Sequence, residues 1–598
     1  MPTFGVPFRR VSSLASSAFG VSLTCARASA VAEYDAAVDA YAGSRLSAFP
    51  LAQRASESDS TCVAAHALAG SLAVWSGGGG RGAYAGAIAR EKGAACVRAG
   101  RATAREATLV LSAEALAAGR LRVAARVLDD HLERVPTDLL AIRLAVDAWR
   151  SAGDAASAFR TLACVFQSWD PRHRGAAHVA ALLAGALVDT GNVSRAEGMA
   201  ASVLSADPGD TVAVMAAARS FLSRGGMDEA ARFLRETEDS WGGVGESEVE
   251  SVNVTSLHAL AAGLAAETGG AGFRGALARY DAHLAAACGG GVASVGDAAR
   301  TLWLLDLLES PVDSGVIAGG AAVKGLFGLA SGGGGAAQAQ LHYFSTPRRS
   351  RWSVLADFFD NSDTTHAAPP PLRNPSADVI GALVLAKADF DGGVGERPRG
   401  EALAAHLKAV DEAAEDAKST VTDAEWLHAA TASLGLPPPA SSLLGMTDTP
   451  RAATALVASV AARGLVAYAQ RDFARASTLL SDARGGWGLL PPLGVAGGDV
   501  PCPPNSIAGL LELTLISTAA GSPTPQLLPR ARALAGARTT LAPQSPLAWA
   551  VLGGVLEKCA IVAKGERGAG AADHHWDAQV RAAKERAHAL GWNQGATY

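Results

Sequence analysis

A pattern that returns about every 34 residues between Ala113 and Trp241 limits what this chain can fold into more than any other feature. Successive copies carry a glycine that is followed, five residues later, by an alanine. The glycines are Gly119, Gly153, Gly191 and Gly225, and the alanines are Ala124, Ala158, Ala196 and Ala230. One such pair is common in an alanine-rich chain, whereas a tandem series at nearly constant spacing indicates an internal structural repeat.

Each residue class in the repeat meets a physical requirement of stacked helix pairs. Glycine ends a first helix at low cost, because it has no Cβ and adopts the left-handed conformation freely. Alanine in the second helix lets two helix axes approach closely. Pro136 and Pro208 stop second helices, because proline has no N–H to donate. The period is that of tetratricopeptide repeats, so we predict an all-α fold: a tetratricopeptide-like helix-pair solenoid wound as a right-handed superhelix.

The sequence divides this predicted solenoid into two lobes. Helical spacing begins near Ser29, and further helix pairs are expected after Trp241. Composition changes sharply between Gly315 and Pro375, where glycine and proline runs indicate a loop insertion that carries one helix. We expect a leader over residues 1–28, an N-terminal lobe over 29–312, an insertion over 313–376 and a C-terminal lobe over 377–598.

Composition excludes several classes of function. The net charge of -5 and the pI near 6.2 provide no electrostatic basis for binding nucleic acid or an anionic membrane surface. The apolar runs are short or are interrupted by charge, as at Lys324 and Arg463, so we expect no membrane insertion. The 7 cysteines are scattered without a Cys-x-x-Cys motif, which is typical of reduced thiols in an intracellular compartment.

The first residues of the chain, Met1 to Val31, leave the location of the protein open. They contain no aspartate or glutamate, are rich in serine, and include Arg9, Arg10 and Arg27, a composition typical of an organellar transit peptide. A short disordered leader fits the same residues. We expect a cytoplasmic protein, with a chloroplast or mitochondrial location as the alternative.

No sequence motif indicates a catalytic site or a cofactor. The chain contains no H-E-x-x-H, no G-x-x-x-x-G-K-[ST] and no nucleophile elbow. Gly77, Gly79 and Gly82 satisfy G-x-G-x-x-G, but dinucleotide binding also requires a preceding strand and a later acidic residue, and we expect neither. We therefore predict an inter-helix loop at these glycines, no cofactor and no enzymatic activity.

Several short motifs are distinctive in their own right. They are V-P-T-D-L-L-A from Val135 to Ala141, S-W-D-P from Ser168 to Pro171, and G-V-S-L-T, D-P-G-D, A-R-Y-D-A-H and P-Q-S-P-L, which begin at Gly20, Asp207, Ala278 and Pro543. In these motifs the chain resembles the tetratricopeptide repeat protein 38 family, from about Gly20 to Ala563 outside the large loops. The resemblance implies an all-helical repeat protein without established catalytic activity, and it sets Met1–Phe19 apart as an addition.

The chain departs from this family at its histidines. The resemblance implies histidines on the first helix of the fourth repeat and a histidine-rich cluster at the start of the fifth. Met215, Arg219 and Phe221 occupy the fourth-repeat positions here, and His258 remains from the other cluster. A histidine needs an orienting partner to act as a general base. We therefore expect His258 to be a capped or core residue, with a chemical role as the alternative.

The repeat geometry makes a binding interpretation more specific. In such a solenoid the first helix of each pair lines the inner groove. The positions predicted to be exposed there are Arg143, Asp147, Arg150, His178, Asp189, Met215 and Arg219, and His258 is a further candidate. The alternative is a solvated charged face on which Arg143 and Asp147 pair at i,i+4.

Three classes of function remain open. We favour a non-catalytic scaffold that binds a protein or peptide in the inner groove, because repeats are present and catalytic motifs are absent. The first alternative is an enzyme of unknown class with a site near His258, which would need several polar groups converging in a pocket. The second is an architectural subunit of a larger assembly, which would show exposed apolar patches on its outer helices.

Overall fold

The described part of the chain is almost entirely helical. The computed structural model describes residues 14–75, 81–242, 252–268, 270–285, 292–309, 351–361, 375–391, 399–416, 422–437, 451–490, 506–522, 525–567 and 574–592. Within these residues the β-structure is one antiparallel hairpin of β1 (Ala15–Ser16) and β2 (Ser22–Leu23). The predicted all-α class is confirmed.

The chain begins with a hairpin that packs against the first helices. These helices are α1 (Ala28–Ala42), α2 (Ala48–Ser58), α3 (Val63–Trp75) and α4 (Arg81–Arg98). Phe19 and Leu23 are buried in the first core, and the backbone N–H of Ala18 donates to the Asp35 carboxylate over 2.8 Å. Residues 14–27 of the expected leader are thus packed against the fold. Met1–Ser13 lie outside the described residues.

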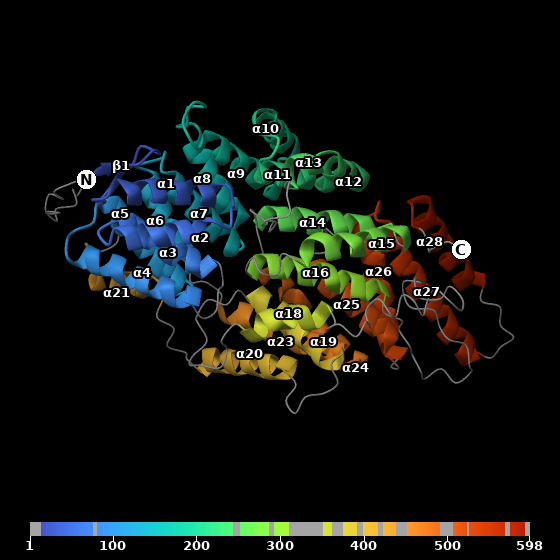
Figure 1. The fold of residues 1–598 in the computed structure, drawn as a ribbon. Helices are drawn as coiled ribbons and strands as arrows, with labels where there is room; N and C mark the ends of the chain where they lie inside the picture. Colours follow the sequence, from blue (N-terminus) through green and yellow to red (C-terminus); the bar gives the residue numbers. More distant parts are fainter. Residues whose placement is uncertain are drawn as a thin grey trace.

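The repeat region folds as four successive helix pairs. They are α5 (Ala104–Ala117) with α6 (Leu121–Leu132), α7 (Leu139–Ser151) with α8 (Ala155–Phe166), α9 (Ala176–Asp189) with α10 (Val193–Ala206), and α11 (Thr211–Ser223) with α12 (Met227–Glu236). Each helix packs on the next along the chain. Figure 1 shows these helices stepping from the blue end of the molecule toward its middle. The helix-pair solenoid is therefore confirmed.

The glycines and alanines of the repeat have the predicted roles. Gly119, Gly153, Gly191 and Gly225 adopt φ values of 67, 73, 78 and 79°, in the left-handed region. A Cβ built on Gly153 would meet no atom within 4 Å, so conformation and not space requires glycine there. Ala124, Ala158, Ala196 and Ala230 are all 0% exposed at the helix crossings.

Further helices of varied length follow the repeats. They are α13 (Glu238–Trp241), α14 (Val252–Ala266), α15 (Gly270–Arg279), α16 (Val292–Glu309), α18 (Arg351–Asn361), α19 (Pro375–Asp391), α20 (Arg399–Asp416), α21 (Asp423–Ser433), α23 (Arg451–Ala469), α24 (Phe473–Ala483), α25 (Ile507–Gly521), α26 (Leu528–Leu541), α27 (Pro546–Arg567) and α28 (His574–Ala589). A π-helical turn, Tyr280–Leu284, extends α15, and 3₁₀ turns at Arg484–Leu489 and Pro525–Leu527 flank α25. In Figure 1, α26, α27 and α28 lie at the opposite end of the molecule from α1.

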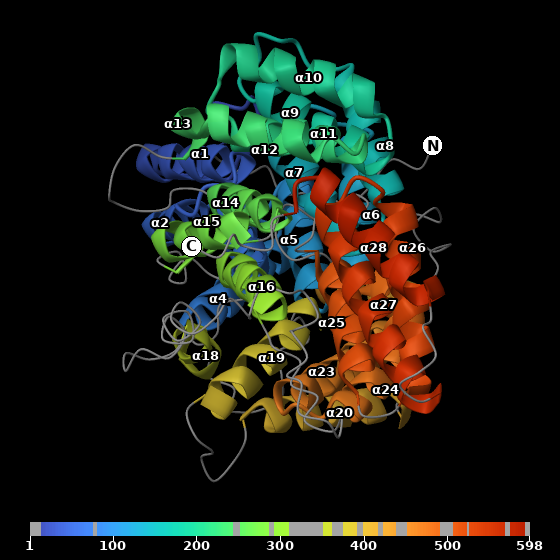
Figure 2. The ribbon, with the colours of Figure 1, turned by 90° about the vertical axis from the view of Figure 1, so that its right-hand side faces the viewer.

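Two large hydrophobic cores divide the described part of the chain, and they meet in α14. Leu257, Leu260 and Leu264 pack into the first core, whereas Ala259 and Ala262 pack into the second. In Figure 2, α14 lies between the helices of the repeat region and α16. The two cores thus meet within α14, and the predicted division into lobes at residues 312 and 377 stays a prediction.

One helix of the C-terminal half returns to the N-terminal lobe. Helix α21 contacts α5, and Leu427 and Leu434 are buried in the first core. Arg120 forms an ion pair with Asp423 and lies 5.7 Å from the ring centroid of Trp426. Figure 1 shows α21 beneath α4, away from the other C-terminal helices. The two lobes are therefore linked by tertiary contacts as well as by the chain.

Two of the predicted loops are partly described. Helix α18 corresponds to the one helix expected in the 313–376 insertion, and its Trp352 and Leu355 are buried in the second core. Gly77 and Gly79 of the G-x-G-x-x-G match lie outside the described residues, and Gly82 belongs to α4. The element before this match is helix α3, so the strand that a dinucleotide site requires is replaced by a helix.

One described helix segment, Pro546–Ala563, has the length and hydropathy to cross a membrane. Of this window, 56% is buried within the fold, where α27 packs against α26 and α28. Core helices of globular proteins meet the same criteria, so this one segment is weak evidence, and the absence of membrane insertion stays a prediction.

Candidate functional site

Most of the groove residues predicted to be exposed are buried. They lie on the expected first helices α7, α9 and α11, and on α14. The side chains of Arg143, Arg150, Asp189, Met215, Arg219 and His258 are at most 9% exposed. Asp147 and His178 are 19% and 20% exposed. The expectation of an open face is therefore wrong for five of the seven positions predicted to be exposed, whereas His258 was expected to be a capped or core residue and is buried.

Arg143 is buried and Asp147 is partly buried because α1 packs against α7. The hydroxyl of Tyr41 donates to Oδ2 of Asp147 over 2.7 Å. Arg143 donates to Asp147 over 2.9 Å, to Ser44 Oγ over 3.2 Å and to the carbonyl of Ala42 over 3.4 Å. The i,i+4 pair of Arg143 and Asp147 thus forms, but in a buried setting, and it binds the end of α1.

The next charged residues tie three repeats together. Asp189 on α9 accepts from Arg150 on α7 over 3.1 Å and from Arg219 on α11. Burial raises the pKa of Asp189, but the two guanidinium groups outweigh burial and hold the pKa below its usual value. Removing one partner from such a buried network typically costs about 3 to 5 kcal/mol. These residues therefore hold neighbouring first helices in register.

His178 lies where the C-terminal end of α1 meets α9. Its Nε2 is 3.8 Å from Oδ1 of Asp39, and the guanidinium of Arg174 is 3.7 Å from the same oxygen. Arg45 approaches the other oxygen of Asp39 at 3.6 Å. The side chains of Arg45 and Arg174 are 52% and 53% exposed. We call Asp39, Arg45, Arg174 and His178 the Asp39 site; it is an accessible, charged part of the region where α1 crosses the repeats.

His258 belongs to a second group of polar side chains, which we call the histidine cluster: Glu238, Trp241, His258, Arg279 and His283. Arg279 donates to both oxygens of Glu238, over 2.7 and 2.8 Å, and to Nδ1 of His258 over 2.8 Å. The rings of His258 and His283 stack with centroids 3.9 Å apart and planes 7° apart. The ring of Trp241 packs against the ring of His258, with the two centroids 5.0 Å apart. Four elements, α13, α14, α15 and the π-helical turn, supply this cluster.

The electrostatics of the histidine cluster keep both imidazoles neutral near neutral pH. Burial, the neighbouring His283 and the positive charge of Arg279 lower the pKa of His258 to about 3, and Glu238 offsets only part of this effect. Burial and Arg279 also lower the pKa of His283. Hydrogen bonds from Arg279 lower the pKa of Glu238 despite partial burial. The cluster thus combines a carboxylate, a guanidinium and two neutral imidazoles.

Sequence reasoning found His258 but not its partners. Arg279 and His283 both lie in the A-R-Y-D-A-H motif, and their spacing of four residues puts them near one helix face. This spacing is the sequence signal that could have identified Arg279 and His283 as partners. Glu238 and Trp241 sit in a short helix before a segment outside the described residues, and no local pattern connects them to His258.

Glu238, His258 and His283 of the histidine cluster bring together side chains of the kind that bind metal ions. One ligand atom from each of Glu238, His258 and His283 lies within 4.8 Å of the others. A carboxylate and two imidazoles are a ligand set that zinc accepts. However, the Arg279 guanidinium already bonds to His258 Nδ1 and to both Glu238 oxygens. A cation would have to displace Arg279, so the arrangement as it stands does not fit a metal.

The chain was compared with known protein families and with solved structures. No known family profile matches the sequence. Among solved structures, the chain is similar to Naa15/Naa10 bound to HypK-THB, with 11% identity over 94% of this chain and 67% of that chain and a TM-score of 0.18. It is also similar to yeast Tom70, with 11% identity over 77% of this chain and 96% of that chain and a TM-score of 0.17. Similarities this low support no functional argument. The helix-pair repeats are tetratricopeptide-like, and the tetratricopeptide repeat protein 38 family stays a resemblance.

Proposed function

We propose that the protein is a non-catalytic helical-repeat scaffold that binds an acidic or mixed-charge segment of a protein partner at the Asp39 site. The observation that supports this proposal is the charge imbalance there. One carboxylate, Asp39, faces Arg45, Arg174 and His178 at 3.6 to 3.8 Å. These separations are long for ion pairs, and the arginines are half exposed, so both can turn toward a ligand.

The surroundings of the site keep this positive excess. The interaction with His178 lowers the pKa of Asp39 most, and the two arginines lower it further against the effect of burial, so Asp39 is charged near neutral pH. Asp210 also faces His178, but its carboxylate accepts from the backbone N–H groups of Val212 and Ala213 and caps α11. A partner carboxylate would therefore meet two arginines that one aspartate balances only in part.

A fluorescent oligoglutamate peptide with both ends blocked tests this proposal. Replacing Arg45 and Arg174 by glutamate removes the two cations that would attract the peptide carboxylates. This double substitution should therefore weaken binding by about tenfold or more. The matched control is Arg195→Glu on the outer helix α10, which is exposed and changes the net charge in the same direction. Fluorescence anisotropy at low and physiological salt measures the affinities. The Asp39 site would be refuted if the peptide showed no saturable binding. It would also be refuted if the Arg45 and Arg174 variant and the Arg195→Glu control lost equal affinity after correction for net charge.

The histidine cluster favours one second candidate, an enzyme that uses His283 as a general base. His283 is exposed, its pKa is lowered by burial and Arg279, and stacking on His258 orients its ring. An oriented, neutral imidazole is what general-base catalysis requires. A panel of chromogenic esters, amides and phosphates would test this function. The enzyme function would be supported if the protein turned over a substrate, if His283→Ala removed that activity, and if His283→Phe, which keeps a stacked ring, did not restore it. If no substrate were turned over, the function would be excluded for these substrate classes.

A further inference from the structure

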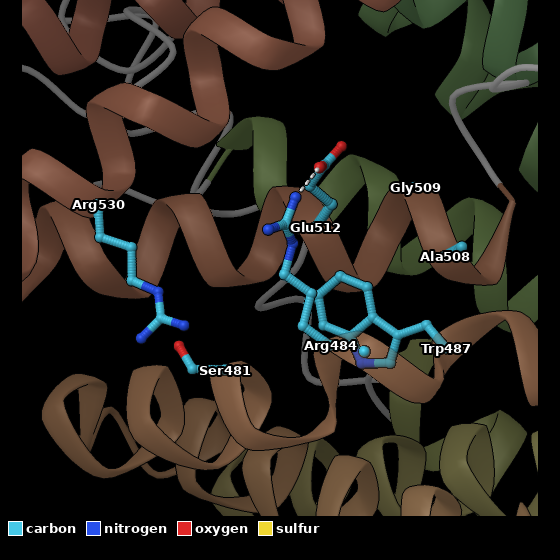
Figure 3. Close-up of a pocket in the computed structure, with 8 residues that line it drawn as sticks. Ser481, Arg484, Trp487, Ala508, Gly509, Glu512 and Arg530 are labelled. Atoms are coloured by element: carbon cyan, nitrogen blue, oxygen red, sulfur yellow. Dashed lines mark ion pairs between the residues drawn. The ribbon is translucent and has the colours of Figure 1, made fainter.

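A cavity of about 560 Å³ opens between α24, the 3₁₀ turn that follows it, α25 and α26. Ser481, Arg484, Trp487, Glu512 and Arg530 line it, together with small residues. Figure 3 shows the guanidinium of Arg530 directed toward the Ser481 hydroxyl on one side of the cavity. On the other side, Arg484 is directed toward Glu512. This cavity is remote in sequence from the Asp39 site and the histidine cluster.

The charges around the cavity do not balance. Arg530 forms no ion pair with any residue in the described part of the chain. The Glu512 carboxylate lies 3.2 Å from the buried guanidinium of Arg538 and 3.6 Å from Arg484. The cavity lining thus holds one carboxylate, which the buried Arg538 also contacts, and Arg484 and Arg530 give the cavity a positive excess.

Two neutral donors in the wall are also unsatisfied. The Ser481 hydroxyl and the Trp487 indole N–H are shielded from solvent, and neither has a hydrogen-bond partner among the described residues. Trp487 as a whole is only 7% exposed. Buried polar groups without a partner are rare in native proteins and cost free energy. A ligand oxygen placed between Ser481 and Arg530 would accept from both.

We propose that this cavity binds a phosphate monoester. Guanidinium groups bind phosphate oxygens with charge-assisted hydrogen bonds, and a dianion matches the positive excess that Arg530 and Arg484 give the cavity. The phosphate sits between Arg530 and the Ser481 hydroxyl, and Arg484 turns toward it from its long contact with Glu512. The organic group of the ligand lies against Trp487 and Ala508, and a cavity of this volume has room for it.

Isothermal titration calorimetry of the full-length protein with phenyl phosphate and with inorganic phosphate tests the proposal. Phenyl phosphate should bind more tightly than inorganic phosphate, because its ring contacts the apolar wall. Arg530→Gln should weaken binding about tenfold or more, and Ser481→Ala several-fold. Arg475→Gln is the matched control, since Arg475 is exposed on the same helix as Ser481 but does not line the cavity. Thermal melts without ligand establish that each variant is folded.

A further calorimetric titration, with a phosphotyrosine peptide, distinguishes between the two possible sources of the phosphate monoester. Tighter binding of the peptide than of phenyl phosphate, lost in Arg530→Gln, assigns the site to a phosphorylated protein side chain. Tighter binding of free phenyl phosphate assigns it to a small metabolite. The proposal is overturned if wild-type protein shows no saturable heat with any of these probes, or if Arg475→Gln weakens binding as much as Arg530→Gln.

Discussion

Nη1 of Arg279 donates a hydrogen bond to Nδ1 of His258 over 2.8 Å, so a permanently charged guanidinium holds a neutral imidazole in place. Arginine has donors and no acceptor, and it stays protonated in proteins. Nδ1 of His258 must therefore be the acceptor. The two residues come from α15 and α14, and protonating the imidazole would break their contact.

This contact predicts a pH-dependent stability. The pKa of His258 is about 3 in the folded state, against about 6.5 in an unfolded chain. The folded pKa is lowered, so the stability contribution is complete above pH about 6.5 and is lost as the pH falls toward 3, with a slope of up to about 1.4 kcal/mol per pH unit. His258→Phe keeps a ring against His283 but removes the titrating group. Urea unfolding between these pH values should show a smaller slope for the variant; equal slopes would contradict the buried neutral imidazole.

A second prediction concerns the competition between Arg279 and metal. In the wild-type protein Arg279 occupies the donor atoms of Glu238 and His258, so cobalt(II) should produce no visible absorption bands from tetrahedral coordination. Arg279→Leu frees Glu238, His258 and His283 together, and bands should appear in this variant. Adding His283→Ala to Arg279→Leu should remove them. Equal bands in the wild-type protein would show that the guanidinium does not block the site.

The repeat register predicts the effect of enlarging a crossing residue. Ala158 is 0% exposed where α8 meets its neighbours, so Ala158→Leu should overpack the site and cost about 1 to 3 kcal/mol. Ala156 is exposed on the same helix, and Ala156→Leu is the control, with an expected change within about 0.5 kcal/mol. Chemical denaturation of both variants measures the difference. A parent-like stability of Ala158→Leu would mean that the register is wrong.

The fold could be predicted from the sequence because its determinants are local. The helix-ending conformation of Gly153 and the close crossing at Ala158 depend on neighbours within one helix pair, and a fixed period makes both visible along the chain. The place where the two cores meet could not be read in the same way. Helix α14 is shared by two cores, and only the packing of Leu257 on one face and Ala259 on the other shows this.

The exposure of the predicted groove residues could not be predicted, because at Arg143 and Asp147 it depends on α1, a helix far from them in the sequence. Tyr41 and Asp147 are separated by 106 residues, and no repeat position signals that α1 lies across α7. The same holds for the partners of His258. Glu238 and His283 approach it only when α13, α14 and the π-helical turn pack together. Charged residues on a first helix were therefore correctly placed in the fold and incorrectly assumed to be exposed.

The last prediction concerns the recognition of a free peptide C-terminus. Asp147 accepts from Tyr41 and Arg143, and Arg143 also donates to Ser44 and to the carbonyl of Ala42. A terminal carboxylate brought beside Asp147 would meet like charge and no free cation, at a cost of about 1 kcal/mol or more. An acidic peptide with a free C-terminus should therefore bind no more tightly than the same peptide with an amidated end.

The measurement is a paired calorimetric titration with the two peptides. Asp147→Asn should leave the affinity of the amidated peptide unchanged, because the proposed contacts lie at Arg45 and Arg174 instead. If the free-terminus peptide binds about tenfold more tightly to the wild-type protein, and Arg143→Met removes that gain, then Arg143 is open to ligands. That outcome would mean that α1 leaves the groove in solution, since the buried contacts of Arg143 with Ser44 and Ala42 exclude a peptide carboxylate while α1 is in place.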